Sequence, residues 1–81
     1  MRITVRLFAR LRELAGTETL AVDLLEPATV ADAWRATVAV APALAPFDRA
    51  ISCAVNANFS RMSHPVAVGD DVAFLPPVSG G

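Results

Sequence analysis

The stretch VAFLPPVSGG, at positions 72–81, is the part of the sequence that is most informative about the fold. Val72 and Phe74 recur with the period of two that is typical of a strand. The strand runs directly into Pro76-Pro77, whose rings restrict φ and favour an extended path. We therefore expect a last strand at the centre of a sheet, leading into an extended, exposed tail formed by residues 76–81.

The composition of the tail suits a chain end that reacts inside a narrow active site. Gly80 and Gly81 carry no side chains, so a terminal carboxylate can enter a narrow active site that any Cβ would block. Val78 and Ser79 are small and uncharged, so burying them in a partner's channel costs little desolvation. The alternative interpretation is an ordinary loose chain end without a chemical role.

A carboxylate at the end of such a tail is a poor electrophile, because its charge repels nucleophiles. It must first be activated, most simply as a mixed anhydride with AMP, which a nucleophile such as sulfide or persulfide can then displace. The rest of the sequence offers no machinery for this activation. We therefore expect the activating enzyme to be a separate protein.

Upstream of the tail, the first half of the chain predicts two strands and a short helix. Ile3, Val5 and Leu7 alternate with polar residues, which indicates a strand with one wet face. Residues 8–15 have helical spacing, and Gly16 stands where a helix C-terminal cap belongs. A second alternating strand covers 20–24 and ends near Pro27.

The main helix follows a start signal at Thr29 and Asp32, a variant of the capping box. Apolar residues then recur at helical spacing, with Trp34 as the anchor of the buried face. Pro42 ends the helix or follows soon after it. Residues 43–49 are expected to be a connector.

The second half predicts short strands and turns. A third strand covers 51–55, a turn follows at 56–58, and 59–62 forms a short strand. His64-Pro65 begins a loop, because the residue before a proline avoids the helical region. Gly69-Asp70 gives a further turn before the last strand.

This order of elements predicts an α+β fold. A hairpin, a crossover helix and returning strands together favour a mixed sheet with the main helix packed on one face. The length of 81 residues predicts a single domain, 1–81, with 76–81 as its tail.

Composition argues against several classes of function. The net charge is −1, so no basic footprint for nucleic acid or an anionic membrane surface is present. No stretch approaches the roughly 18 apolar residues of a membrane span. A single Cys53 cannot form an internal disulfide, which favours a cytoplasmic location. All seven basic residues are Arg, so no lysine is available to accept an isopeptide bond.

No catalytic constellation is evident. His64 has no acid or nucleophile partner in sequence, and we expect a surface role for it. Cys53 lies on an apolar strand face, where cysteine usually acts as a small buried hydrophobe. Asp70-Asp71 is a weak signal for a cation, and no Cys/His cluster has metal-ligand spacing. Trp34 is expected to belong to the core.

The chain resembles the small, sulfur-carrying subunits of molybdopterin synthase, which are ubiquitin-like β-grasp proteins. The resemblance runs over essentially the whole length. It rests on the block at 7–16, LFARLRELAG, on Ala54-Val55-Asn56, on His64-Pro65, and above all on the ending at 72–81. The middle of the chain, 23–48, is less distinctive.

The resemblance implies a mechanism and a set of partners. An ATP-dependent activating enzyme adenylates Gly81, and a sulfur donor such as a cysteine desulfurase or rhodanese leads to a thiocarboxylate there. Gly80 and Gly81 then enter the large synthase subunit, where the sulfur passes to cyclic pyranopterin monophosphate and begins the dithiolene. The synthase is a heterotetramer of two small and two large subunits. No stably bound cofactor or metal is implied.

The resemblance also implies partner-binding residues. Phe59 and Leu75 align with apolar positions that face the large subunit, although both positions also suit an ordinary core. Arg12 fits a partner contact and a solvated helix face equally well. The tail residues that enter the partner are Pro76, Pro77, Val78 and Ser79, ahead of Gly80 and Gly81.

Two alternatives remain open at this stage. The first is a sulfur carrier for another pathway, such as thiamine synthesis, cysteine synthesis or tRNA thiolation, since such carriers share the fold and the two glycines. The second is a β-grasp interaction module with an unreactive tail. A sulfur carrier should lose its function when Gly81 is deleted, whereas an interaction module should keep it.

Overall fold

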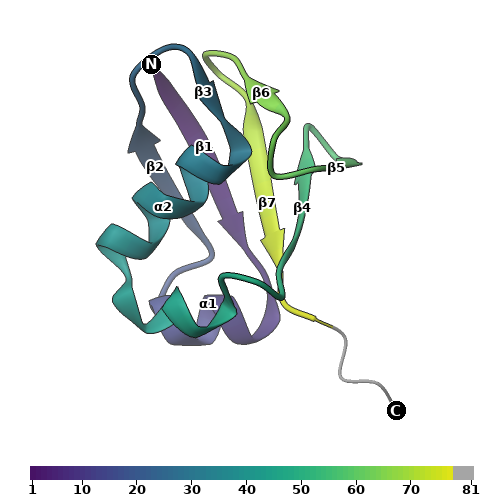
Figure 1. Ribbon diagram of the computed structural model, residues 1–81. Helices are drawn as coiled ribbons and strands as arrows, with labels where there is room; N and C mark the ends of the chain where they lie inside the picture. Colours follow the sequence, from purple (N-terminus) through teal and green to yellow (C-terminus); the bar gives the residue numbers. More distant parts are fainter. Residues whose placement is uncertain (78–81) are drawn as a thin grey trace.

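The sheet is organised around its first and last strands, which lie side by side and run parallel. The structure, a computed structural model, describes residues 1–77 (Figure 1). Strand β1 (Arg2–Leu7) pairs with β7 (Asp71–Leu75) in the register Thr4↔Asp71 to Leu7↔Phe74. Every second residue of each strand is buried, as the period-two alternation predicts.

Five strands complete a mixed sheet in the order β2-β1-β7-β4-β5. Strand β2 (Thr19–Asp23) pairs antiparallel with β1, and β4 (Ser52–Val55) pairs antiparallel with β7. Strand β5 (Asn58–Ser60) pairs antiparallel with β4 at the edge. The prediction that the last strand is central is therefore confirmed, since β7 has two strands on either side.

Helix α1 (Ala9–Ala15) connects β1 to β2 at the end of the sheet where β7 finishes (Figure 1). It ends as the sequence predicts, because Gly16 has a left-handed φ of 75° and its amide donates to the carbonyl of Arg12. Phe8, predicted to be the first helical residue, is instead an extended N-cap with a φ of −120°.

Helix α2 (Val30–Val40) packs on one face of the sheet, as predicted (Figure 1). Its capping box is formed, with the Thr29 hydroxyl accepting from the amide of Asp32 and the Asp32 carboxylate accepting from the amide of Thr29. Trp34 is buried and meets Phe74 of β7 edge-on, with ring centroids 5.0 Å apart. This contact fixes the helix over the central strand.

Two predicted loops contain regular structure. The expected connector 43–49 begins with a 3₁₀ helix, η1 (Pro42–Phe47), whose Leu44 is fully buried. The loop expected from His64-Pro65 includes strand β6 (Pro65–Val66), which pairs antiparallel with β3 (Ala28–Thr29). Both elements depend on contacts that are remote in sequence, so local patterns gave no signal for them.

The turn between β4 and β5 has a left-handed backbone. Asn56 and Ala57 have φ values of 49° and 71°, which are those of a tight hairpin turn. The turn expected at 56–58 is confirmed at Asn56 and Ala57, whereas the strand expected at 59–62 begins one residue earlier and is shorter, since β5 spans Asn58–Ser60. Within residues 1–77 no helix is long and apolar enough to cross a membrane.

Candidate functional site

The two faces of the sheet are unequal, and the face without α2 is the candidate site. On that face the paired positions form one row across four strands: Phe59↔Ala54, Ala54↔Ala73 and Ala73↔Arg6. Leu75 follows on the same side of β7, two residues after Ala73. We call this surface the open face, and it consists of Arg6, Phe8, Ala54, Phe59, Ala73 and Leu75.

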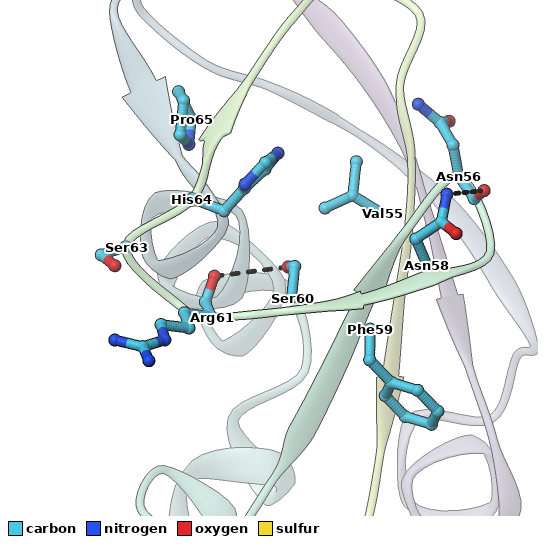
Figure 2. A pocket seen from close by; sticks show the side chains of 9 residues that line it. All are labelled: Val55, Asn56, Asn58, Phe59, Ser60, Arg61, Ser63, His64 and Pro65. Atoms are coloured by element: carbon cyan, nitrogen blue, oxygen red, sulfur yellow. Dashed lines mark hydrogen bonds between the residues drawn. The ribbon is translucent and has the colours of Figure 1, made fainter.

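Phe59 is the most prominent residue of the open face, with 81% of its surface exposed. Figure 2 shows its ring on the side of β5 opposite to Ser60, as strand alternation requires. Isolated exposed apolar residues are common, but along this row two alanines, Ala54 and Ala73, separate Phe59 from the charged Arg6. The interpretation of Phe59 as ordinary core is therefore wrong, because its side chain faces solvent.

Phe8 is a second exposed aromatic residue that the sequence analysis did not single out. It is 45% exposed and lines one hollow together with Arg6 and Ala73. The signal was present in the sequence, because Phe8 follows Leu7 and breaks the apolar–polar alternation of β1. The helical spacing places Phe8 in the helix, where an apolar residue needs no further explanation.

The open face leads directly into the tail. Leu75 is half-buried and ends β7, Pro76 is half-buried, and Pro77 is exposed. The tail positions Val78, Ser79, Gly80 and Gly81 lie outside the described residues. The predicted partner-binding residues Phe59 and Leu75 are thus both on the face beside which the tail begins.

Arg12 lies on α1 at the border of this face. Its Nη1 is 3.6 Å from a carboxylate oxygen of Glu18, and the two side chains are 55% and 71% exposed. Such a surface pair contributes little to stability. Arg12 also lines a small hollow with Arg6 and Phe8, so its position is compatible with a contact to a partner.

A more polar hollow lies behind β5, on the other side of the strand from the Phe59 ring (Figure 2). Its lining includes His64, Ser60 and Arg61, yet these groups do not form a catalytic arrangement. The Ser60 hydroxyl donates to the carbonyl of Arg61 at 3.4 Å, and no hydrogen bond of residues 1–77 involves the His64 side chain. His64 is exposed, as predicted.

The remaining candidates for chemistry serve the fold. Cys53 is buried on β4, and its Sγ is 3.3 Å from the carbonyl oxygen of Ser60. Asp71 pairs with Arg6, whereas Asp70 accepts from the amide of Ala67 at 2.8 Å. Among residues 1–77 no three His, Cys, Asp or Glu side chains gather as a metal site would require.

Asp70 is held as a carboxylate by its neighbours. The hydrogen bond from the Ala67 amide lowers the pKa of Asp70 below its ordinary value of 3.8, and the Asn56 side-chain amide adds to this effect. Asn56 also accepts from the amide of Asp71 at 3.0 Å. These bonds connect the β4–β5 turn to the turn that precedes β7, so the charged groups here hold the central strand in place.

The mixed sheet, the single covering helix and a chain that leaves from the central strand define a ubiquitin-like β-grasp protein. More specifically, the chain belongs to the ThiS family, whose pattern matches residues 5–81. The match includes the last two glycines, which lie beyond the described residues.

Individual relatives cover nearly the full length of the chain. It is 39% identical to the molybdopterin synthase sulfur carrier subunit of Escherichia coli, over 98% of this chain and 99% of that protein. It is also 39% identical to small archaeal modifier protein 1 of Haloferax volcanii, over 94% of this chain and 97% of that protein. A crystal structure of the Haloferax protein covers all of both chains, with a TM-score of 0.90 and 37% identity.

Proposed function

We propose that this protein is the sulfur-carrier subunit of a molybdopterin synthase and that Gly81 carries the sulfur. The observation that supports this most strongly is the full-length similarity to a relative named as such a subunit. The open face provides a second, physical support, because it offers exposed apolar side chains beside the start of the tail. A carrier needs such a surface to dock on the protein that receives its sulfur.

The proposed chemistry occurs on the Gly81 carboxylate. An activating enzyme transfers AMP from ATP to one carboxylate oxygen, and pyrophosphate leaves. A thiol reductant releases sulfide from the persulfide of a donor such as a cysteine desulfurase or rhodanese and is itself oxidised to a disulfide. This sulfide attacks the carbonyl carbon and expels AMP, which leaves a thiocarboxylate. The thiocarboxylate sulfur is then transferred to cyclic pyranopterin monophosphate, and water restores the carboxylate. ATP is consumed on the activating enzyme, and this chain needs no bound cofactor.

The proposed docking surface is the open face. Phe59, Phe8 and Leu75 would be covered by the large synthase subunit while residues 76–81 enter its pocket. Burial of an exposed aromatic ring is favourable by roughly 2 kcal/mol or more, so a few such residues can dominate an interface. In the proposed heterotetramer, each of two large subunits holds one copy of this chain.

The first test is an intact mass of the protein made together with its activating enzyme, ATP and a sulfur source. We expect the mass gain of one oxygen replaced by sulfur, located on Gly81. An unchanged mass under these conditions would contradict a carrier role and favour the β-grasp interaction module.

Variants at Gly81 test the role of the tail. Deletion of Gly81 should abolish thiocarboxylate formation and product synthesis with the fold intact. Gly81→Ala should reduce product formation about 100-fold, because a misplaced reacting group costs roughly that factor. Cys53→Ala is the matched control and should retain sulfur transfer. Normal synthesis by Gly81→Ala would contradict a narrow channel, and loss of transfer by folded Cys53→Ala would assign the chemistry to the thiol.

A second candidate function is that of a protein modifier, which is the role in the name of the Haloferax relative. The same Gly81 adenylate would then be attacked by an amine of another protein instead of by sulfide. A search of cell extracts for covalent adducts that end in the Gly81 remnant distinguishes the two functions. Sulfur carriers for thiamine synthesis, cysteine synthesis or tRNA thiolation are distinguished in another way. The thiocarboxylate form is mixed with the acceptor system of each pathway, and the transfer of sulfur to each acceptor is measured.

A further inference from the structure

The open face is not flat, because small residues lie between large ones at its centre. A hollow of about 250 Å³ is lined by Arg6, Phe8, Asn56, Ala57, Asp71 and Ala73, and its lining is mainly apolar. Ala73 contributes only a methyl group, and Phe8 and the left-handed turn at Asn56 and Ala57 line the same hollow. The hollow therefore has the size for one large apolar side chain.

A charged group stands at the border of this hollow. The Arg6 Nε donates to Asp71 Oδ2 at 2.6 Å, and the Arg6 side chain is 52% exposed. The hydrogen bonds of residues 1–77 use none of the Nη atoms of Arg6. A guanidinium is a planar fork that suits a carboxylate, and the Nη atoms of Arg6 are available for a further acceptor.

We propose that the open face recognises its partner at two points: an apolar side chain of the partner fills the hollow over Ala73, and a partner carboxylate binds the Nη atoms of Arg6. This rests on the proposed function, and the occupant is the large synthase subunit. The hollow adjoins the last strand, from whose end the tail departs at Leu75. A protein that holds the tail therefore lies close enough to fill it.

Asp71 gives the Arg6 contact its specificity. It holds the Arg6 side chain on the sheet, since the Nε bond fixes one edge of the guanidinium and leaves the Nη atoms for the partner. A lysine could not bind Asp71 and the partner through separate atoms in this way, because its ammonium is a single point charge. Arg6 is thus a specificity-determining residue, whereas Phe59 and Leu75 supply apolar area that many partners could cover.

Matched pairs of variants test each contact by titration calorimetry against the purified large subunit. Arg2 is on the same strand and face, pairs with Asp23, and lies outside the hollow. Arg6→Glu should weaken binding at least about tenfold, and less so in high salt, whereas Arg2→Glu should change it by less than about twofold. Equal losses for both variants, or none for Arg6→Glu, would overturn the carboxylate contact.

The hollow is tested by filling it. Ala73→Leu should weaken binding at least about tenfold, because its side chain occupies the space meant for the partner. Ala21→Leu is the control, since Ala21 is exposed on β2 and outside the hollow. Circular dichroism confirms that each variant is folded. If Ala73→Leu unfolds, the smaller Ala73→Val fills part of the hollow and should weaken binding in the same direction. Unchanged affinity of a folded Ala73→Leu would overturn the hollow.

The same samples separate this inference from the proposed function. If the wild type forms the thiocarboxylate and binds the large subunit, but neither variant pair differs, the two-point recognition alone is wrong. If the wild type does not bind the large subunit at all, both proposals are overturned.

Discussion

Ala57 adopts a left-handed backbone that an L-amino acid with a Cβ adopts at a cost. Its φ of 71° follows the φ of 49° at Asn56, a residue whose short polar side chain tolerates this region. Alanine has no such compensation. The turn joins β4 to β5 and forms part of the hollow on the open face.

Ala57→Gly should therefore stabilise the protein. Relief of the left-handed strain is worth roughly 1–2 kcal/mol, and the greater freedom of glycine in the unfolded chain offsets about half of it, which leaves a gain of about 0.5–1 kcal/mol. Urea unfolding followed by circular dichroism measures this gain. Ala39→Gly, in the exposed last turn of α2, is the control and should lose roughly 0.5–1 kcal/mol. Destabilisation by both substitutions would refute the strain at Ala57.

At the scale of single elements, the start of α2 is the best example of a structure that its sequence specifies locally. Thr29 and Asp32 bond to each other's backbone amides, so two unpaired donors of the first turn are satisfied. The same Thr29 belongs to strand β3, which pairs with β6. The cap therefore fixes the helix and the small second sheet at one point.

Thr29→Ala should lower the free energy of unfolding by about 1 kcal/mol, since it removes the capping hydroxyl. Thermal or urea unfolding measures this loss. Thr29→Ser keeps the hydroxyl and should lose clearly less. If Ser and Ala at this position were equally destabilising, the methyl group of Thr29 rather than its hydroxyl would be the stabilising part.

How much of the fold could be predicted differs between elements for physical reasons. Strand β1, the Gly16 cap and helix α2 carry their signals within a few consecutive residues, and all three were predicted. Strand β6 is two residues long, begins with a proline and exists through its partner β3, so no local period could show it. Helix η1 is stabilised by the burial of Leu44 in the hydrophobic core, which a local pattern could not show.

The candidate site was predictable in part for the same reason. The tail and Phe59 follow from a sequence motif and a family resemblance. The hollow over Ala73 requires the pairing of β1 with β7 and the placement of the β4–β5 turn, since Arg6, Ala73 and Asn56 come from different parts of the chain. Phe8 was overlooked because its exposure depends on where α1 begins.

At the scale of the whole molecule, the ionisation of carboxyl groups makes the free energy of unfolding depend on pH. Hydrogen bonds from the amide of Thr29 lower the pKa of Asp32, and those from Ala67 and Asn56 lower the pKa of Asp70, each below its ordinary value of 3.8. A carboxyl group with a lowered pKa stabilises the folded state fully above that ordinary value. Its contribution is lost as the pH falls through the lowered pKa.

We therefore expect the unfolding temperature to be nearly constant above about pH 5 and to fall below about pH 4. Thermal unfolding followed by circular dichroism from neutral pH to about pH 2 measures this. Asp70→Asn removes one of the titrating groups and should flatten the acid limb. A wild-type curve without an acid limb would contradict this assignment.

The parallel pairing of β1 and β7 also determines how the sheet responds to a force applied to the tail. The amino end of β1 and the carboxyl end of β7 point to opposite ends of the sheet (Figure 1). A tail drawn into a partner's channel would load the bonds between β7 and its two neighbours along the strand axis, all at once, rather than opening them one by one. Traction on the tail would therefore have to break two rows of β-ladder hydrogen bonds together before β7 could leave the sheet.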